Sequence, residues 1–317
     1  MRFSKVFLGK RKVLLLFALA FLAVLPASLQ AQAAQEQAAH DQAERIMRAL
    51  AAAYPNKIGA PEFRGGDWAF RLRGRWFYYA DGRILPEELR ARAASYSPLR
   101  FNQNYPLDLP SWESTSADRA ERTRRMEERA AAGGQQQPAA VRLPRPQYFF
   151  EELWDIRSRE QAFARQAQIS FLGRSVTIHS DLVGTMRSIE TIILNEASVN
   201  PVVRQWVNSL ESVAGWNWRN IRTSNNRSLH SYGIAIDILP RDLGGLATYW
   251  AWETSRTPQW WNIPYSRRWH PPNEVIRAFE SFGFVWGGKW TSFDTMHFEY
   301  RPEVFILSNI PLERGLE

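Results

Sequence analysis

Three residues in the C-terminal half of the chain combine two imidazoles with one carboxylate: His230, Asp237 and His297. A second carboxylate, Asp294, lies three positions before the last of them. Catalytic zinc sites use three protein ligands of this kind and keep a fourth position open, whereas structural zinc sites are usually closed by four ligands, often cysteines. A carboxylate beside such a site can act as the general base for a zinc-activated water. The combination predicts a catalytic zinc and a hydrolase.

Two short strands are expected to position these groups. Residues 233–239 alternate small or charged residues with isoleucines, which is typical of a buried strand. Asp237 then shares one face with small residues that leave room for a metal and a substrate, while the isoleucines face the core. His230 lies on a loop just before this strand, and His297 opens a second strand over 297–300. Two neighbouring strands therefore bring the four groups together.

The motifs around these residues resemble those of a known peptidase family. Ser-x-His-x-x-Gly-x-Ala-x-Asp at 228–237 and Asp-x-x-His at 294–297 look like the zinc D-Ala-D-Ala carboxypeptidases of the VanY type and the endolysin L-alanyl-D-glutamate peptidases. The run Gly-Phe-x-Trp-Gly-Gly-x-Trp at 283–290 resembles the endolysin branch. Aspartate rather than glutamate at position 294 also favours that branch. The resemblance covers roughly residues 170–305.

The resemblance implies a role for each motif residue. By position, His230, Asp237 and His297 bind zinc, and Asp294 is the catalytic base. The implied substrate is peptidoglycan, cleaved at an amide bond of the stem peptide. A carboxypeptidase acting on terminal D-Ala-D-Ala and an endopeptidase acting on L-Ala-D-Glu would use the same metal chemistry, so the sequence leaves the bond open.

Several further residues are candidates for contact with the substrate. Arg219, Arg222 and Arg227 precede the first ligand, and arginine suits planar recognition of a carboxylate or an oxyanion. A Trp-Arg-x-Ile run, which family members share, favours Arg219 or Arg222 near the site; we rank Arg222 first, with a solvated surface arginine as the alternative for each. Ser228 either contacts a ligand or substrate or caps the turn. Trp290, the last residue of the tryptophan-glycine run, is a candidate for substrate binding.

Other interpretations apply to the remaining polar residues. Asp294 could instead be a turn or cap residue. Glu299 is expected to face opposite His297 on the second strand and to form a structural ion pair. The other histidines are interpreted as core or surface residues rather than ligands: His40, His179 and His270.

The N-terminus has the features of an export signal. Five basic residues within the first twelve precede an apolar segment over 13–25, and the small-residue run 31–34 fits an Ala-x-Ala cleavage site. The apolar segment is shorter than the ~20 residues that span a bilayer. We therefore expect cleavage and a periplasmic or cell-envelope location, with an uncleaved membrane anchor as the alternative. The sequence has no cysteine, which excludes a lipoprotein anchor, disulfides and thiolate metal ligands.

The charge balance argues against a nucleic-acid enzyme. The whole chain carries a net charge of +8, but residues 1–33 hold five basic residues and no acidic one, so the remainder carries about +3. This modest charge suits a protein that works near anionic wall polymers. A rival class remains, namely a non-catalytic zinc-containing module for wall binding or signalling, similar to fold relatives of the hedgehog type. Asp294 counts against that class, because a structural zinc needs no base.

The pattern of composition predicts an α+β protein with four parts. An amphipathic helix over 148–167, a strand pair around Gly173 and helices over 181–197 and 271–282 should flank a small, mainly antiparallel sheet. A highly charged helix over 113–132 is expected to be exposed or poorly packed. Five tryptophans between the metal motifs are assigned with equal weight to the core or to a cleft lip. The predicted parts are a signal peptide (1–33), an accessory region with a β-hairpin (34–132), a linker (133–147) and a zinc peptidase domain (148–317).

Overall fold

The computed structural model describes residues 27–99, 101, 105–108, 115–134, 143–221 and 226–313. Contacts divide the chain into residues 1–45 and 46–317. Helix α2 (Ala27–Ala53) begins in the first unit and ends in the second, and the other elements belong to the second. Most of the predicted export signal lies outside the described residues. Within those ranges, no helix has the length and hydropathy that a membrane span requires.

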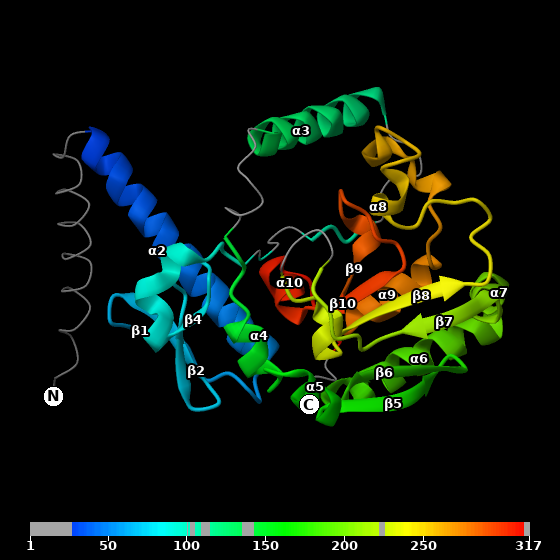
Figure 1. Ribbon diagram of the computed structural model, residues 1–317, viewed down its shortest axis with the longest axis horizontal. Helices are drawn as coiled ribbons and strands as arrows, with labels where there is room; N and C mark the ends of the chain where they lie inside the picture. The colour runs from blue at the N-terminus through cyan, green and yellow to red at the C-terminus, as the bar shows by residue number, and fades with distance from the viewer. Residues whose placement is uncertain are drawn as a thin grey trace, which may run out of the picture. The chain divides into compact units, whose positions relative to one another are not determined.

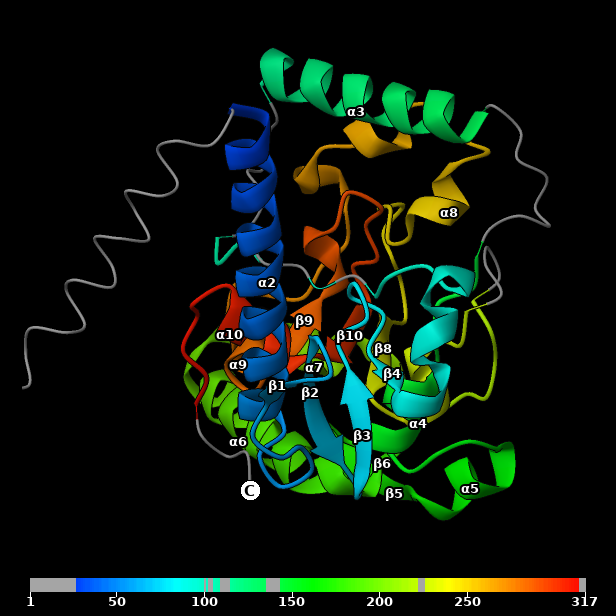
Figure 2. The same cartoon turned by 90° about the vertical axis from the view of Figure 1, so that its left-hand side faces the viewer.

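An antiparallel sheet follows α2 and contains the predicted hairpin. Its strand order is β1-β2-β3-β4 (Figures 1 and 2). Large apolar residues occupy every second position of β2. Trp68, Phe70 and Leu72 therefore point to one side of the sheet, where they are buried. The bounds are β1 (Glu62–Arg64), β2 (Asp67–Leu72), β3 (Arg75–Tyr78) and β4 (Leu85–Pro86).

A second antiparallel sheet carries the predicted metal ligands. Its order is β7-β8-β10-β9, so the two motif strands, β8 and β10, are neighbours at its centre (Figure 1). All the strand pairs in this part are antiparallel and the elements around them are helical, as an α+β fold requires. The predicted class is therefore confirmed. The bounds are β7 (Leu210–Ala214), β8 (Ala235–Pro240), β9 (Phe284–Trp286) and β10 (His297–Tyr300).

Helices cover one face of this sheet and leave the other for polar groups. The Phe279 ring of α9 stacks on the Phe298 ring of β10, with centroids 4.2 Å apart. Phe171, from the hairpin of β5 and β6, meets the same Phe279 ring edge-on at 5.9 Å. This apolar layer takes up the isoleucine face of β8, so that the alternate residues face away from it. The bounds are β5 (Gln166–Phe171), β6 (Arg174–His179), α6 (Val183–Val199), α7 (Pro201–Ser209), α9 (Asn273–Ser281) and α10 (Pro302–Leu307).

The single helix predicted over 148–167 is wrong. The segment contains two short helices, α4 (Tyr148–Leu153) and α5 (Arg159–Ala164), and strand β5 starts at Gln166. Asp155 has a φ of 54°, a left-handed conformation that no helix interior tolerates. Ser158 then caps α5 by accepting a hydrogen bond from the backbone N–H of Gln161. Local capping chemistry thus overrides the continuous helical periodicity.

The charged helix α3 (Ser116–Gly134) is better packed than its composition predicts. Thr123 Oγ1 accepts hydrogen bonds from Trp261 Nε1 at 3.2 Å and from Asn262 Nδ2 at 2.9 Å. Met126 lies against the tryptophan cluster of the segment between the metal motifs. One polar helix therefore covers part of that segment, which contains α8 (Trp250–Glu253) and the 3₁₀ helices η5 (Trp260–Asn262) and η6 (Tyr265–Arg267).

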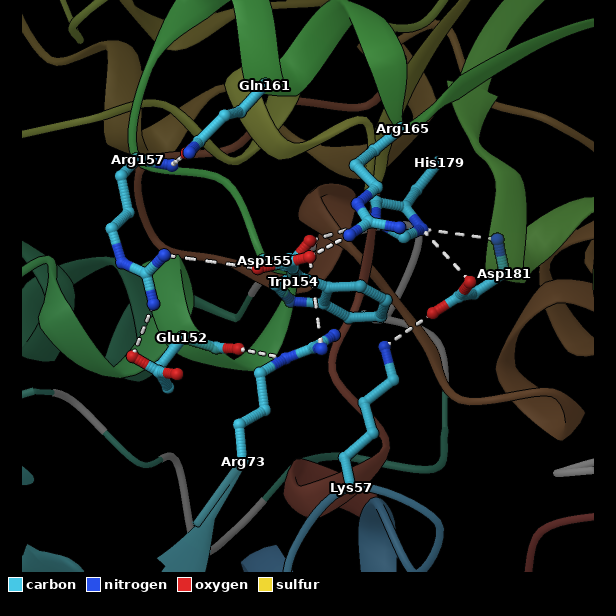
Figure 3. Close-up of polar contacts among 10 residues, drawn as sticks. All are labelled: Lys57, Arg73, Glu152, Trp154, Asp155, Arg157, Gln161, Arg165, His179 and Asp181. Carbon is cyan, nitrogen blue, oxygen red and sulfur yellow. Dashed lines mark hydrogen bonds and ion pairs between the residues drawn. The ribbon is translucent and has the colours of Figure 1, made fainter. Parts of the chain in front are cut away.

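A network of charged residues joins the region of the N-terminal sheet (β1–β4) to residues 152–181 (Figure 3). Lys57 Nζ lies 2.6 Å from Asp181 Oδ2 and 4.0 Å from the centre of the Trp154 ring. Arg73 Nε donates a hydrogen bond to the Glu152 carbonyl at 2.9 Å. The N-terminal sheet is thus tied by specific polar contacts to the part of the chain that carries the metal motifs.

His179 is a core residue in this network, as interpreted from the sequence. Its Nδ1 accepts a hydrogen bond from the Asp181 backbone N–H at 3.2 Å, so the proton lies on Nε2, which donates to the Trp154 carbonyl at 3.2 Å. Both ring nitrogens of the neutral form are therefore used. Burial lowers the pKa of His179 to about 4, against an ordinary value of 6.5.

This shift predicts a loss of stability in mild acid. Because the folded pKa lies below the unfolded one, the contribution of His179 is complete above pH 6.5 and is lost as the pH falls toward 4, by about 1.4 kcal/mol per pH unit. In His179→Gln the free energy of unfolding should be lower at pH 7 but should fall less steeply below pH 6.5. Urea unfolding of both proteins between pH 7 and pH 4.5 measures this difference, and parallel curves would contradict it.

Candidate metal centre

The strand register places two of the predicted ligands opposite each other. His297 of β10 pairs directly with Asp237 of β8. His230 lies in the 3₁₀ helix η4 (Leu229–Tyr232), which ends at Gly233 with a φ of 70°. A Cβ at Gly233 would lie 2.6 Å from the backbone nitrogen of His179, and other residues rarely adopt this positive φ, so glycine allows the chain to turn here from η4 into β8. The His-x-x-Gly spacing thus returns His230 to the side of Asp237.

The three side chains converge on one point. His297 Nδ1 lies 2.9 Å from Asp237 Oδ1, and His230 Nε2 lies 3.3 Å from Asp237 Oδ2. The two ring nitrogens, His230 Nε2 and His297 Nδ1, are 3.3 Å apart. All three ligand atoms lie within 4.8 Å of one another, so the group could hold a metal ion.

Each imidazole is oriented by a second hydrogen bond through its other nitrogen. His230 Nδ1 donates to the Gly215 carbonyl at 2.7 Å, which leaves the lone pair of Nε2 facing the other ligands. His297 Nε2 lies 3.2 Å from Glu299 Oε2 and leaves Nδ1 facing them in the same way. Metal-binding histidines are commonly held by a carbonyl or a carboxylate of this kind. The donor set and its supporting contacts therefore fit a metal that takes two imidazoles and one carboxylate.

Glu299 is the functional residue that the sequence interpretation misplaced. Residues two positions apart on a strand share a face, so Glu299 lies beside His297 and not opposite it. The predicted ion pair does exist, because Arg301 Nη1 lies 3.5 Å from Glu299 Oε1. Glu299 thus serves both partners, and strict counting along the strand would have found its contact with the ligand.

Charge compensation keeps the ligand carboxylate ionised. Burial acts to raise the pKa of Asp237, but hydrogen bonds with His230 and His297 hold it well below the usual range. Burial opposes the charged form of His297, yet its hydrogen bonds with Asp237 and Glu299 raise its pKa well above the ordinary value. The site therefore favours a positive charge beside Asp237, which an imidazolium or a metal ion can supply.

Asp294 lies at this centre in a different environment. Its Oδ1 is buried and has no hydrogen-bond partner among the described residues, so this oxygen does not cap a turn. The pKa of Asp294 is raised to about 7, chiefly by burial; the charge of His297 acts to lower it, and those of Asp237 and Glu299 also act to raise it. A carboxyl group in this range can both take and release a proton at neutral pH.

The segment between the metal motifs holds the Asp294 loop in place. Tyr249 forms a β-bridge with Asp294, and the Thr295 backbone N–H donates to the Thr248 carbonyl at 2.8 Å. The buried rings of Trp260 and Phe293 belong to the adjoining cluster. Packing thus accounts for much of this aromatic cluster, although Trp252 is 46 % exposed. No residue pattern in the sequence identified this support.

Of the two arginines predicted near the site, the structure describes only one. Arg219 is tied through its backbone, which accepts a hydrogen bond from Ser228 N–H at 3.1 Å and donates to Ser231 Oγ at 2.9 Å. Its side chain is exposed, and its charge acts to lower the pKa of Asp294, so it lies near the base. Arg222 lies outside the described residues.

Three other candidates have defined neighbours. The Arg227 guanidinium lies over the Trp218 ring, 4.0 Å from its centre. Ser228 is buried at the start of η4 and makes no side-chain capping hydrogen bond. The Trp290 ring lies 5.6 Å from the His297 ring and so borders the centre.

Comparisons with known proteins agree with the motif resemblance. Residues 222–300 match the model of a family described as D-alanyl-D-alanine carboxypeptidase, and this stretch contains the three ligand residues and Asp294. The match supports a peptidase of that family, but it does not distinguish the VanY-type branch from the endolysin branch. Residues 46–101, which include the N-terminal sheet, match a domain of unknown function. No curated protein and no solved structure matches the chain.

The geometry predicts that the purified protein binds about one zinc ion per chain, as a three-ligand site would. His230→Ala and Asp237→Ala should each abolish binding, because two remaining ligands hold the ion poorly. His270→Gln is the control, since His270 is a half-buried histidine stacked on Tyr265 and outside the cluster. Elemental analysis after dialysis checks the result, and full zinc content in both ligand variants would refute the assignment.

Proposed function

We propose that this protein is a zinc-dependent peptidase that hydrolyses an amide bond in the stem peptide of peptidoglycan. The observation that carries the proposal is the convergence of three ligand atoms beside Asp294, whose buried Oδ1 has no hydrogen-bond partner among the described residues. The family match over residues 222–300 supports a peptidase and a peptidoglycan substrate. A purely structural metal site would have no use for such a carboxyl group, which argues against a non-catalytic wall-binding or signalling module.

The donor atoms suit zinc, and each of the surrounding residues has a defined task. His230 Nε2, His297 Nδ1 and a carboxylate oxygen of Asp237 would hold the ion. Bound zinc lowers the pKa of a water molecule and polarises a carbonyl group. Asp294 accepts the proton of the attacking water and later delivers it to the leaving amine. Arg219 or Arg222 stabilises the negative charge that develops on the carbonyl oxygen.

The substrate bond and the cellular location are part of the same proposal. The description of the matching family favours a terminal D-Ala-D-Ala bond, whereas the 283–290 run resembles peptidases that cut L-Ala-D-Glu. Mass spectrometry of digested muropeptides separates the two, because only the first releases free D-alanine. Export to the periplasm or cell envelope, inferred from the N-terminal sequence, would bring the protein to this substrate.

Asp294→Asn should retain zinc and fold but lose most activity. Asparagine is nearly isosteric with aspartate but cannot accept the proton, so kcat should fall by roughly 10² to 10⁴-fold. The measurement is steady-state hydrolysis of purified muropeptides, with zinc content determined on the same samples. An unchanged kcat would remove Asp294 from the reaction. Wild-type protein that binds zinc and hydrolyses no muropeptide would favour the non-catalytic module.

The arginines can be ranked by lysine substitution. Lysine keeps the charge but loses the planar fork, so the arginine that contacts the substrate should lose about tenfold or more in kcat/KM. We expect Arg222→Lys to show this loss first and Arg219→Lys second. Arg227→Lys is the matched control, because its guanidinium lies against Trp218. Equal kcat/KM in all three variants would leave charge stabilisation to the metal and backbone donors.

A further inference from the structure

A continuous chain of buried and partly buried polar contacts connects Tyr54 to the candidate metal ligand His297. The Tyr54 hydroxyl donates to Glu303 Oε2 at 2.8 Å. The other oxygen of Glu303, Oε1, accepts a hydrogen bond from Arg301 Nε. Arg301 Nη1 lies 3.5 Å from Glu299 Oε1, and Glu299 Oε2 lies 3.2 Å from His297 Nε2. Every link therefore uses a different atom, and no carboxylate oxygen is shared between two links.

The chain fixes the direction of each group within it. Glu303 is fully buried, and a buried carboxylate oxygen that loses its donor carries a large desolvation penalty. Tyr54 satisfies Oε2 and so leaves Oε1 for Arg301. Without the hydroxyl, Glu303 would gain most by turning both oxygens toward the guanidinium. Arg301 would then be drawn away from Glu299, which is the carboxylate that orients His297.

The position of Tyr54 is set by contacts that are independent of the metal centre. Its ring meets the rings of Trp154 and Tyr300 edge-on, with centroids 6.0 Å and 6.3 Å away. Lys57 lies three residues further on and covers the same Trp154 ring (Figure 3). Tyr54 thus reaches Glu303 from the stretch 46–101, which matches a domain of unknown function and lies outside the match to the peptidase family.

We propose that Tyr54 is a positioning residue for the metal centre. Through Glu303, Arg301 and Glu299 it holds the imidazole of His297 with Nε2 toward Glu299 and Nδ1 toward the other ligands. The N-terminal sheet region therefore contributes to metal affinity without contacting the metal or the substrate. This inference rests on the proposed metal centre, but it does not depend on the reaction or on the peptide bond that is cleaved.

The test is the zinc affinity of the metal-free full chain, measured by competition with a chromogenic chelator. Removing a group that directly orients a ligand typically costs 10- to 100-fold in metal affinity, so Glu299→Gln should show that loss, and the more remote Tyr54→Phe about 3- to 10-fold. Tyr78→Phe is the matched control. Tyr78 is also buried in the 46–101 stretch and donates a hydrogen bond to a carboxylate, Glu87, at 3.0 Å. This hydrogen bond lies outside the series of contacts that connects Tyr54 to His297.

Thermal unfolding with and without zinc separates positioning from stability. Both tyrosine variants should lower Tm in the metal-free protein, but only Tyr54→Phe should reduce the increase in Tm that zinc produces. Wild-type affinity in Tyr54→Phe together with a normal zinc-dependent increase in Tm would make Tyr54 a structural residue only and overturn the proposal. Should Tyr54→Phe fail to fold, Glu303→Gln tests the same chain, because it keeps an acceptor for Tyr54 and weakens the link to Arg301.

The outcome also distinguishes this inference from the proposed function. If the wild-type protein binds no zinc, the assignment of the metal centre is refuted, and both proposals are refuted with it. If wild type and Tyr54→Phe bind zinc with equal affinity, only the positioning role of Tyr54 is refuted. Reduced affinity in Tyr54→Phe with no peptidase activity in wild type would support the positioning role and reject the enzyme.

Discussion

The pairing of Asp237 with His297 across β8 and β10 is the constraint on which the site depends. A shift of one residue in this register would replace Asp237 with an isoleucine and turn the carboxylate toward the core. The register is held from the other face, where the isoleucines of β8 are buried and the Phe298 ring stacks on Phe279 of helix α9. The apolar core on that face therefore helps to fix the geometry of the metal-binding residues.

Three carboxyl groups close together create the electrostatic character of the centre. Asp237 and Glu299 are stabilised as anions by hydrogen-bonded imidazoles and, for Glu299, by Arg301, and the pKa of each is lowered despite burial. In the part of the chain that the structure describes, Asp294 has no such partner for its buried oxygen, and its pKa is raised to about 7. Environment thus divides chemically similar side chains into groups suited to the roles that we propose for them: metal ligand, orienting group and proton carrier.

The sequence predicted the parts of the site that depend on local periodicity. The spacing from His230 to Asp237 and the alternation over 233–239 were enough to place two ligands on a turn and a strand. It could not predict the bridge between Tyr249 and Asp294 or the contact between Tyr54 and Glu303, because pairs so distant in the chain leave no periodic trace. The error at Glu299 had a different origin. Glu299 was predicted on the strand face opposite His297, although residues two positions apart on a strand share a face.

The contacts of Tyr54 suggest why charged groups, in addition to the ring contact with Tyr300, join this part of the chain to β10. Replacing a buried ion pair with apolar residues often costs no stability, but an apolar contact has little directional preference. An imidazole held only by packing could rotate and exchange Nδ1 for Nε2 at the metal. A carboxylate fixed by Arg301, itself fixed by Glu303, excludes that rotation. The buried charges therefore act on the orientation of His297, whose correct nitrogen must face the other ligands before any metal binds.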